Sequence, residues 1–258
     1  GRLHGQASAQ PVTVQVASAN GTATAGSDYA ALAATTVTFA PGETSKTVTV
    51  AITEDTVYEG NESYTVNLSA PTGGATIGTP TVTTTIHDDG TGSIPPGNPG
   101  VPTDDRPRVT AASSPSVNEG GNLDFSVTLS NTSATPTTVT LSPTSGTATL
   151  GTDTNPAQVS FDGGLTFVPV VGTTVSVPAG ASSFIVRLPT VNDGTSEPTE
   201  NLTLGAATTQ NAAPVVGTGT ILDPSVPVLS IAGPVDVNEA AGTLTYTISL
   251  SNASAGAV

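Results

Sequence analysis

Short runs of alternating apolar and polar residues recur along the first 90 residues of the chain. Successive side chains of a β-strand point to opposite faces of a sheet, so a period of two predicts strands with one buried face. No stretch of useful length carries apolar residues at helical spacing with a cap, and turn residues such as Asn20 and Gly21 separate the runs. The pattern predicts an antiparallel β-sandwich. The expected strands cover residues 11–16, 36–39, 47–52, 64–68 and 81–86.

A second set of alternating runs begins after a segment of different character. Residues 88–108 are rich in proline and glycine and show no alternation, which indicates a linker between two domains. The second set is long enough for a complete seven-stranded sandwich. Its runs cover residues 123–129, 137–141, 157–161, 173–177, 183–188, 201–204 and 215–221.

The two sets are copies of one repeat, and part of a third copy follows them. The opening of the second domain recurs near the end of the chain, whereas the first domain has no such opening. We therefore expect an incomplete sandwich at 1–90, a linker at 91–107, a complete sandwich at 108–224 and the opening two strands of a further sandwich at 225–258. The matching segments are 21–28 with 146–153, 54–62 with 192–200, 85–88 with 220–223, and 116–131 with 236–252.

Two explanations of the missing strands stay open. The chain is either a window from a longer tandem array, in which neighbouring repeats complete the fold, or residues 226–258 insert into the first domain of the next molecule. The second explanation makes copies of the chain head-to-tail partners. Such a contact is heterologous and would propagate as an open fibre. It would also bring Glu239 to the acidic end of the first domain.

Charge and composition exclude several classes of partner. Lys+Arg number 5 against Asp+Glu 20, a net charge of -15 that disfavours nucleic acid and anionic lipid surfaces. No apolar run approaches the roughly 20 residues of a membrane span, so membrane insertion is not expected. The chain has no Cys, which excludes a disulfide framework and thiolate metal sites. His87 and His4 have no nucleophile beside them, and we expect no enzyme.

The acidic residues concentrate in the loops and leave the predicted strands nearly free of charge. In a sandwich, the loop at Asp28, the loop at 55–59 and the chain end at 88–89 could converge at one pole. Carboxylates gathered there would raise one another's pKa values unless a cation lay among them. Oxygen ligands without Cys favour Ca²⁺ over Zn²⁺. The alternative is that these acids are solvated turn formers.

The motifs of the first domain resemble those of the Calx-beta repeat family, which occurs in large bacterial surface adhesins and extracellular fibre proteins. The resemblance is carried by residues 21–29, 39–46, 55–62 and 86–89. The second domain departs from the pattern, because Thr154 replaces a tyrosine and the closing aspartate run is reduced to Asp223. The resemblance implies tandem, immunoglobulin-like, seven-stranded β-sandwiches and Ca²⁺ as the bound ion.

Carried over residue by residue, the resemblance assigns Ca²⁺ ligands to both domains and to the final segment. It also implies an extracellular or cell-surface location in a bacterium and a structural or adhesive role in a fibre, as in a biofilm, stiffened by Ca²⁺. The alternative is a calcium-sensing regulatory module of a larger protein. The implied ligands are Asp28, Asp55, Glu59, Asp88 and Asp89 in the first domain, Glu119, Asp153, Asp193, Glu197 and Asp223 in the second, and Glu239 in the final segment.

Overall fold

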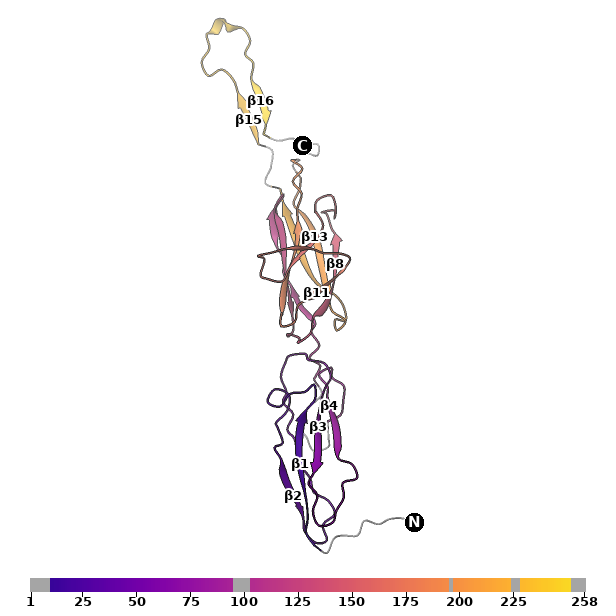
Figure 1. Cartoon of the computed structure of the whole chain (residues 1–258). Helices are drawn as coiled ribbons and strands as arrows, with labels where there is room; N and C mark the ends of the chain where they lie inside the picture. The colour runs from indigo at the N-terminus through magenta and orange to yellow at the C-terminus, as the bar shows by residue number, and fades with distance from the viewer. Residues whose placement is uncertain (1–9, 95–102, 195–196, 224–227, 252–258) are drawn as a thin grey trace. The chain divides into compact units, whose positions relative to one another are not determined.

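The computed structural model describes residues 10–94, 103–194, 197–223 and 228–251. It divides the chain into two compact units, residues 1–106 and residues 107–258 (Figure 1). The middle of the expected linker lies outside the described residues, as do both ends of the expected donor segment, 226–227 and 252–258. None of the helical structure in the described ranges has the length and apolar character needed to cross a membrane.

Unit 2 is a sandwich of two five-stranded sheets. One sheet has the order β10-β9-β12-β7-β5 and the other the order β11-β8-β13-β14-β6. All paired strands are antiparallel except β6 and β14, which run parallel. Each of the seven runs expected for this domain forms a strand, and the short strands β5, β6 and β10 are additional. The strands are β5 (Val109–Ala112), β6 (Ser116–Asn118), β7 (Asn122–Leu129), β8 (Thr137–Ser145), β9 (Gln158–Ser160), β10 (Val168–Pro169), β11 (Thr174–Val177), β12 (Ser183–Pro189), β13 (Glu200–Ala207) and β14 (Val215–Leu222).

Strand β7 lies at the centre of the core of unit 2. It pairs with β12 on one side and β5 on the other, and every second residue points inward. Leu123, Phe125 and Val127 are completely buried, and they belong to one apolar cluster with Val139 and Leu204 of the opposite sheet. Each such side chain contributes roughly 1.5–3 kcal/mol when it leaves water. The alternation in the sequence therefore corresponds to the two faces of each sheet.

Unit 1 contains a single sheet among its described residues. The strands β1 (Val12–Asn20), β2 (Thr35–Phe39), β3 (Glu62–Ser69) and β4 (Thr81–Ile86) pair in the order β2-β1-β3-β4. The repeat places these strands at β8, β11, β13 and β14 of unit 2, which pair in the same order. Unit 1 thus has the counterpart of one sheet of unit 2. The counterpart of the other sheet is not formed by the described residues of unit 1.

The segment 47–52, expected as a strand of unit 1, forms no strand ladder. Only Ile52 forms an isolated bridge, with Tyr29. Its counterpart in unit 2 is β12, which is held on both sides by β7 and β9. Alternation predicts a strand, but a strand also needs a neighbour to satisfy its backbone, and unit 1 has no counterpart of β7 among its described residues.

The core of unit 1 is correspondingly small. Its main buried cluster consists of Ala23, Tyr29 and Tyr64, and the two tyrosine rings stack with their centroids 4.3 Å apart. Val48 and Leu68 remain 40% and 36% exposed. Unit 1 therefore leaves apolar surface in water that the equivalent positions of unit 2 bury.

The last described segment is a β-hairpin. Strands β15 (Leu229–Ala232) and β16 (Thr247–Leu250) pair antiparallel, with Leu229 opposite Leu250. The connection contains one short 3-10 turn, η1 (Glu239–Ala241), which Asn238 caps by accepting a hydrogen bond from the Ala240 N–H. All described residues of the hairpin are exposed. An isolated two-stranded hairpin is marginally stable in water.

Candidate metal centres

Three carboxylates of unit 1 converge at one end of its sheet. Asp28, Glu59 and Glu62 each offer an oxygen atom within 4.8 Å of the others. Asp28 lies in the connection from β1 to β2, and one of its oxygens accepts a hydrogen bond from the Thr24 N–H at 2.5 Å. Glu62 is the first residue of β3, and Glu59 lies in the loop before it. We call these three residues the first carboxylate triad.

The first triad is short of positive charge. Burial, together with the charge of Asp28, raises the pKa of Glu62 to about 7. Burial and the charges of Asp28 and Asp55 also raise the pKa of Glu59. Burial alone would raise the pKa of Asp28. Hydrogen bonds, of which the one from the Thr24 N–H is the strongest, outweigh burial and bring this pKa below its usual value. Glu62 therefore gains or loses its proton around neutral pH, while Asp28 stays charged.

Asp88 extends this acidic end. One of its oxygens accepts the Glu59 N–H at 3.0 Å. Burial raises its pKa; the hydrogen bond from Glu59 opposes this, and the charges of Asp55 and Asp28 add to it. The network ties the closing end of β4 to the loop before β3.

Residues assigned to the linker by the sequence add another acid. The Asp105 N–H donates a hydrogen bond to the carbonyl of Asp88 at 2.8 Å, and the backbones of Asp104 and Asp89 form an isolated antiparallel β-bridge. Burial and the nearby charges of Glu54 and Asp88 raise the pKa of Asp105. Residues 103–106 therefore return to unit 1 and do not form part of a free linker. The aspartate pair at 104–105 was the signal for this role.

Asp89 and Asp55 form local turns. Asp89 accepts hydrogen bonds from both the backbone N–H and the hydroxyl of Thr91, and these bonds lower its pKa. The Arg106 guanidinium lies nearby and donates to the Asp89 carbonyl at 3.2 Å. Asp55 accepts the Val57 N–H at 2.7 Å. Neither residue belongs to the first triad, although the charge of Asp55 acts on Glu59 and Asp88.

Unit 2 repeats the arrangement. Asp153, Glu197 and Glu200 form a second carboxylate triad whose oxygens also lie within 4.8 Å of one another. Asp153 accepts the Thr149 N–H at 2.6 Å, as Asp28 accepts that of Thr24. Burial, followed by the charges of neighbouring acids, raises the pKa values of Glu197 and Glu200.

The opening strands of unit 2 add a further acid to this end. The Glu119 N–H, just beyond β6, donates to the Leu222 carbonyl at 3.0 Å. Burial and then the charges of Asp223, Glu197 and Asp193 raise the pKa of Glu119. Asp223 also accepts the Glu197 N–H at 2.5 Å, the counterpart of the Asp88 contact in unit 1. Glu239, which matches Glu119 in the repeat, is exposed in the connection of the final hairpin.

Each triad contains one acid that the sequence analysis did not select. Glu62 and Glu200 occupy matching positions, and both begin the strand that follows the acidic loop. The shared spacing in the two repeats was the available signal. The expected strands began at Tyr64 and Asn201, so both glutamates fell in the loops before them, where a Glu is ordinarily solvated.

The donor set suits a hard divalent cation. Each triad supplies carboxylate oxygens from three segments, and no sulfur is available because the chain has no Cys. Ca²⁺ takes 6 to 8 oxygens in flexible geometry, which carboxylates, backbone carbonyls and water can supply together. The ion pairs of the described residues lie elsewhere, at Lys46, Arg106 and Arg187. A cation would therefore relieve a repulsion that the described basic side chains leave in place.

The two units repeat one arrangement of β-strands, and each carries a carboxylate triad at one end of its sheet. The chain belongs to the Calx-beta domain family, whose model matches residues 2–90 and 103–232. Calx-beta domains are calcium-binding modules with regulatory or structural roles.

Solved structures give remote likenesses. The crystal structure of the calcium binding domain CBD12 of CALX1.1 is 16% identical, covers 76% of this chain and 67% of its own, and has a TM-score of 0.30. CBD12 from CALX1.2 is 17% identical over 79% of this chain and 71% of its own, with a TM-score of 0.31. The crystal structure of the apo form of the Calx CBD1 domain is 22% identical to this chain. It covers 43% of this chain and 89% of its own, with a TM-score of 0.33. Among curated proteins no match is found.

Proposed function

We propose that this chain is a Ca²⁺-stiffened structural module of an extracellular bacterial fibre or giant surface protein. The observation that carries the proposal is the same carboxylate triad at the matching place in both units, with raised glutamate pKa values in each.

The first triad would hold the ion through three segments of unit 1. Asp28 follows β1, Glu59 lies in the loop before β3, and Glu62 begins β3. Bound Ca²⁺ would supply the positive charge that these side chains lack. The residues themselves orient the oxygens: Thr24 fixes Asp28, and Asp88 fixes the backbone at Glu59. A bound ion would tie the Asp28 loop to the start of β3, and this link would stiffen the unit.

A calcium titration followed by thermal melting tests this function. Ca²⁺ that binds the folded state alone raises its stability by about 2.7 kcal/mol at a hundredfold excess over Kd. We expect the midpoint of the full chain to rise with Ca²⁺ and return with chelator. A midpoint that does not respond to Ca²⁺ would contradict calcium binding. Mg²⁺ at the same concentration is the control for general ionic effects.

The fibre role includes assembly of copies by insertion of residues 226–258 into unit 1 of the next molecule. The open apolar face of unit 1 and the exposed apolar hairpin support this assembly. The proposal is tested by electron microscopy of two separate samples, the full chain and a chain that lacks residues 226–258. We expect filaments from the first only. Filaments that persist after the deletion would rule the insertion out.

A calcium-sensing module is the competing function. It predicts a Ca²⁺-driven change in conformation without assembly. Small-angle scattering at increasing protein concentration, with Ca²⁺ or with chelator, separates the two functions. Growth of the particle mass with concentration supports the fibre, whereas a change of shape at constant mass supports the sensor.

A further inference from the structure

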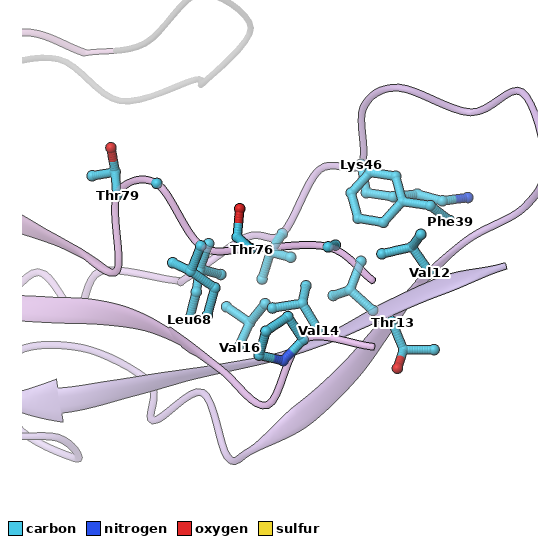
Figure 2. A pocket seen from close by; sticks show the side chains of 15 residues that line it. Val12, Thr13, Val14, Val16, Phe39, Lys46, Leu68, Thr76 and Thr79 are labelled. Atoms are coloured by element: carbon cyan, nitrogen blue, oxygen red, sulfur yellow. The ribbon is translucent and has the colours of Figure 1, made fainter. Parts of the chain in front are cut away.

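Unit 1 carries an apolar groove of about 580 Å³ on the inner face of its sheet (Figure 2). Val14 and Val16 of β1, Phe39 of β2, Leu68 of β3 and Val48 line it on the side of the sheet. Residues 71 and 75–79 of the connection between β3 and β4 complete its lining. In Figure 2 the Val14, Val16 and Leu68 side chains gather on one side of the sheet. Exposed apolar surface of this kind marks an interaction site when a partner of matching shape exists.

Unit 2 shows what covers the same positions in a complete domain. The repeat equates the groove residues with five residues that are at most 3% exposed in unit 2. All five belong to the apolar cluster that contains the inward side chains of β7. The groove therefore lies at the positions that pack against β7 in unit 2. The five counterparts are Val139, Leu141, Val177, Val186 and Ala206.

The final hairpin repeats the covering strands. Strand β16 and the residues before it match β7 in the repeat. Strand β15 pairs with β16 in the same way as β5 pairs with β7. Leu229 lies opposite Leu250, just as Val109 lies opposite Leu129. The inward positions of β7 are 0–3% exposed, whereas those of the hairpin are 42–70% exposed. The matched pairs are Leu123 with Leu244, Phe125 with Tyr246, Val127 with Ile248, and Leu129 with Leu250.

We propose that residues 243–250 of a second copy lie in this groove, antiparallel to residues 45–51 of unit 1, in the register by which β7 pairs with β12. In unit 2, Val186 is opposite Phe125 and Leu188 is opposite Leu123. Transferred through the repeat, Val48 lies opposite Tyr246 of the second copy, and Val50 opposite Leu244. The proposal rests on the head-to-tail assembly proposed above and specifies its strand, direction and register.

Two local features of the groove agree with this register. The repeat places Lys46, whose ammonium group pairs with Glu43 at 2.8 Å, where unit 2 has the buried Phe184. The aliphatic stem of Lys46 would cover Ile248 of the second copy while its charge stays with Glu43 in water. Segment 45–51 would also gain the neighbour that its alternation requires, and so become a strand.

Engineered cysteine pairs test the register, because the chain has no Cys of its own. Thr49 and Thr245 match Arg187 and Asp124, whose side chains meet at 2.7 Å on the outer face of unit 2. A disulfide requires Cα atoms within about 7 Å, so Thr49→Cys with Thr245→Cys should cross-link. The matched control is Ser45→Cys with Thr245→Cys, which the register places four residues apart, roughly 13 Å along a strand.

We expect mild oxidation of the full chain to convert the first pair into a ladder of reducible multimers, at least tenfold more than the control pair. Equal yields from the two pairs, or filaments without any cross-link at Thr49, would overturn the register while leaving head-to-tail assembly standing. A cross-linked monomer would overturn the second copy as occupant. Absence of both filaments and multimers from the unmodified chain would instead remove the assembly on which the register rests.

Discussion

At the scale of single residues, Glu62 concentrates the chemistry of the first triad. It begins β3, so the backbone of the strand holds its side chain beside Asp28 and Glu59. Burial and the charge of Asp28 raise the pKa of Glu62, whereas burial acts against a set of hydrogen bonds, led by that from the Thr24 N–H, which lowers the pKa of Asp28. A cation that enters this site competes with the proton of Glu62.

Replacing Glu62 by an amide separates binding from folding. Glu62→Gln keeps the size of the side chain and removes its charge, so the chelated protein should melt no lower than wild type. Its Ca²⁺ affinity should fall about tenfold or more, which corresponds to about 1.4 kcal/mol. Calorimetric titration measures the affinity. The control is Glu43→Gln, which makes the same charge change beside Lys46 and should leave the Ca²⁺ affinity unchanged. Equal affinities in all three proteins would exclude Glu62 as a ligand.

The raised pKa of Glu62 also fixes a sign for the pH dependence. Between the unfolded value near 4.5 and the folded value of about 7, the folded state binds more protons than the unfolded state. In chelator, the contribution of Glu62 to the free energy of unfolding of unit 1 should therefore be fully present below the unfolded pKa and be lost as pH rises through about 7. Urea unfolding followed by tyrosine fluorescence measures it, since Tyr29, Tyr58 and Tyr64 all lie in unit 1. Glu62→Gln should flatten the slope, and an unchanged slope would contradict the assignment.

At the scale of elements, the same alternating pattern has two outcomes. In unit 2 it gives β12, held between β9 and β7, whereas in unit 1 the matching residues 47–52 remain outside any ladder. The pattern specifies which side chains face inward. Whether a ladder forms depends on a neighbouring strand, and that neighbour comes from elsewhere in the chain or from another copy.

A charge placed on the inward face of the hairpin should block assembly. Tyr246→Asp would bury a carboxylate against Val48 of the acceptor, which is strongly unfavourable without a partner. We expect loss of filaments with an unchanged melting transition of unit 2. Thr247→Asp adds the same charge on the outward face and should assemble. Light scattering and electron microscopy compare the two, and filaments from Tyr246→Asp would show that this side chain stays in water.

At the scale of the whole molecule, the two units differ in the size of their cores. The main buried cluster of unit 1 has three members, whereas that of unit 2 contains inward residues from both sheets. Burial of apolar surface is the dominant stabilising contribution, so the units should differ in stability even though they share one repeat.

Unfolding of the chain at a concentration too low for assembly should therefore occur in two steps. Tyrosine fluorescence, which reports mainly on unit 1, should change at a lower urea concentration than the circular dichroism of the remaining β-structure. Ca²⁺ should move the first step upward. A single step with coincident probes, with and without Ca²⁺, would contradict this difference.

The sequence by itself determined the β-class, the repeat and the acidic loops, because alternation, turn residues and matched spacing are local properties that need no partner. The same information equated Glu239 with Glu119 and the final hairpin with β5–β7. Tertiary structure decided which acids meet: Glu62, Glu200 and Asp105 join the acidic ends, while Asp89 turns toward Thr91 and Arg106. It also decided that residues 47–52 form no strand, because a ladder and a cation site both depend on segments that are distant in the chain and close only in the fold.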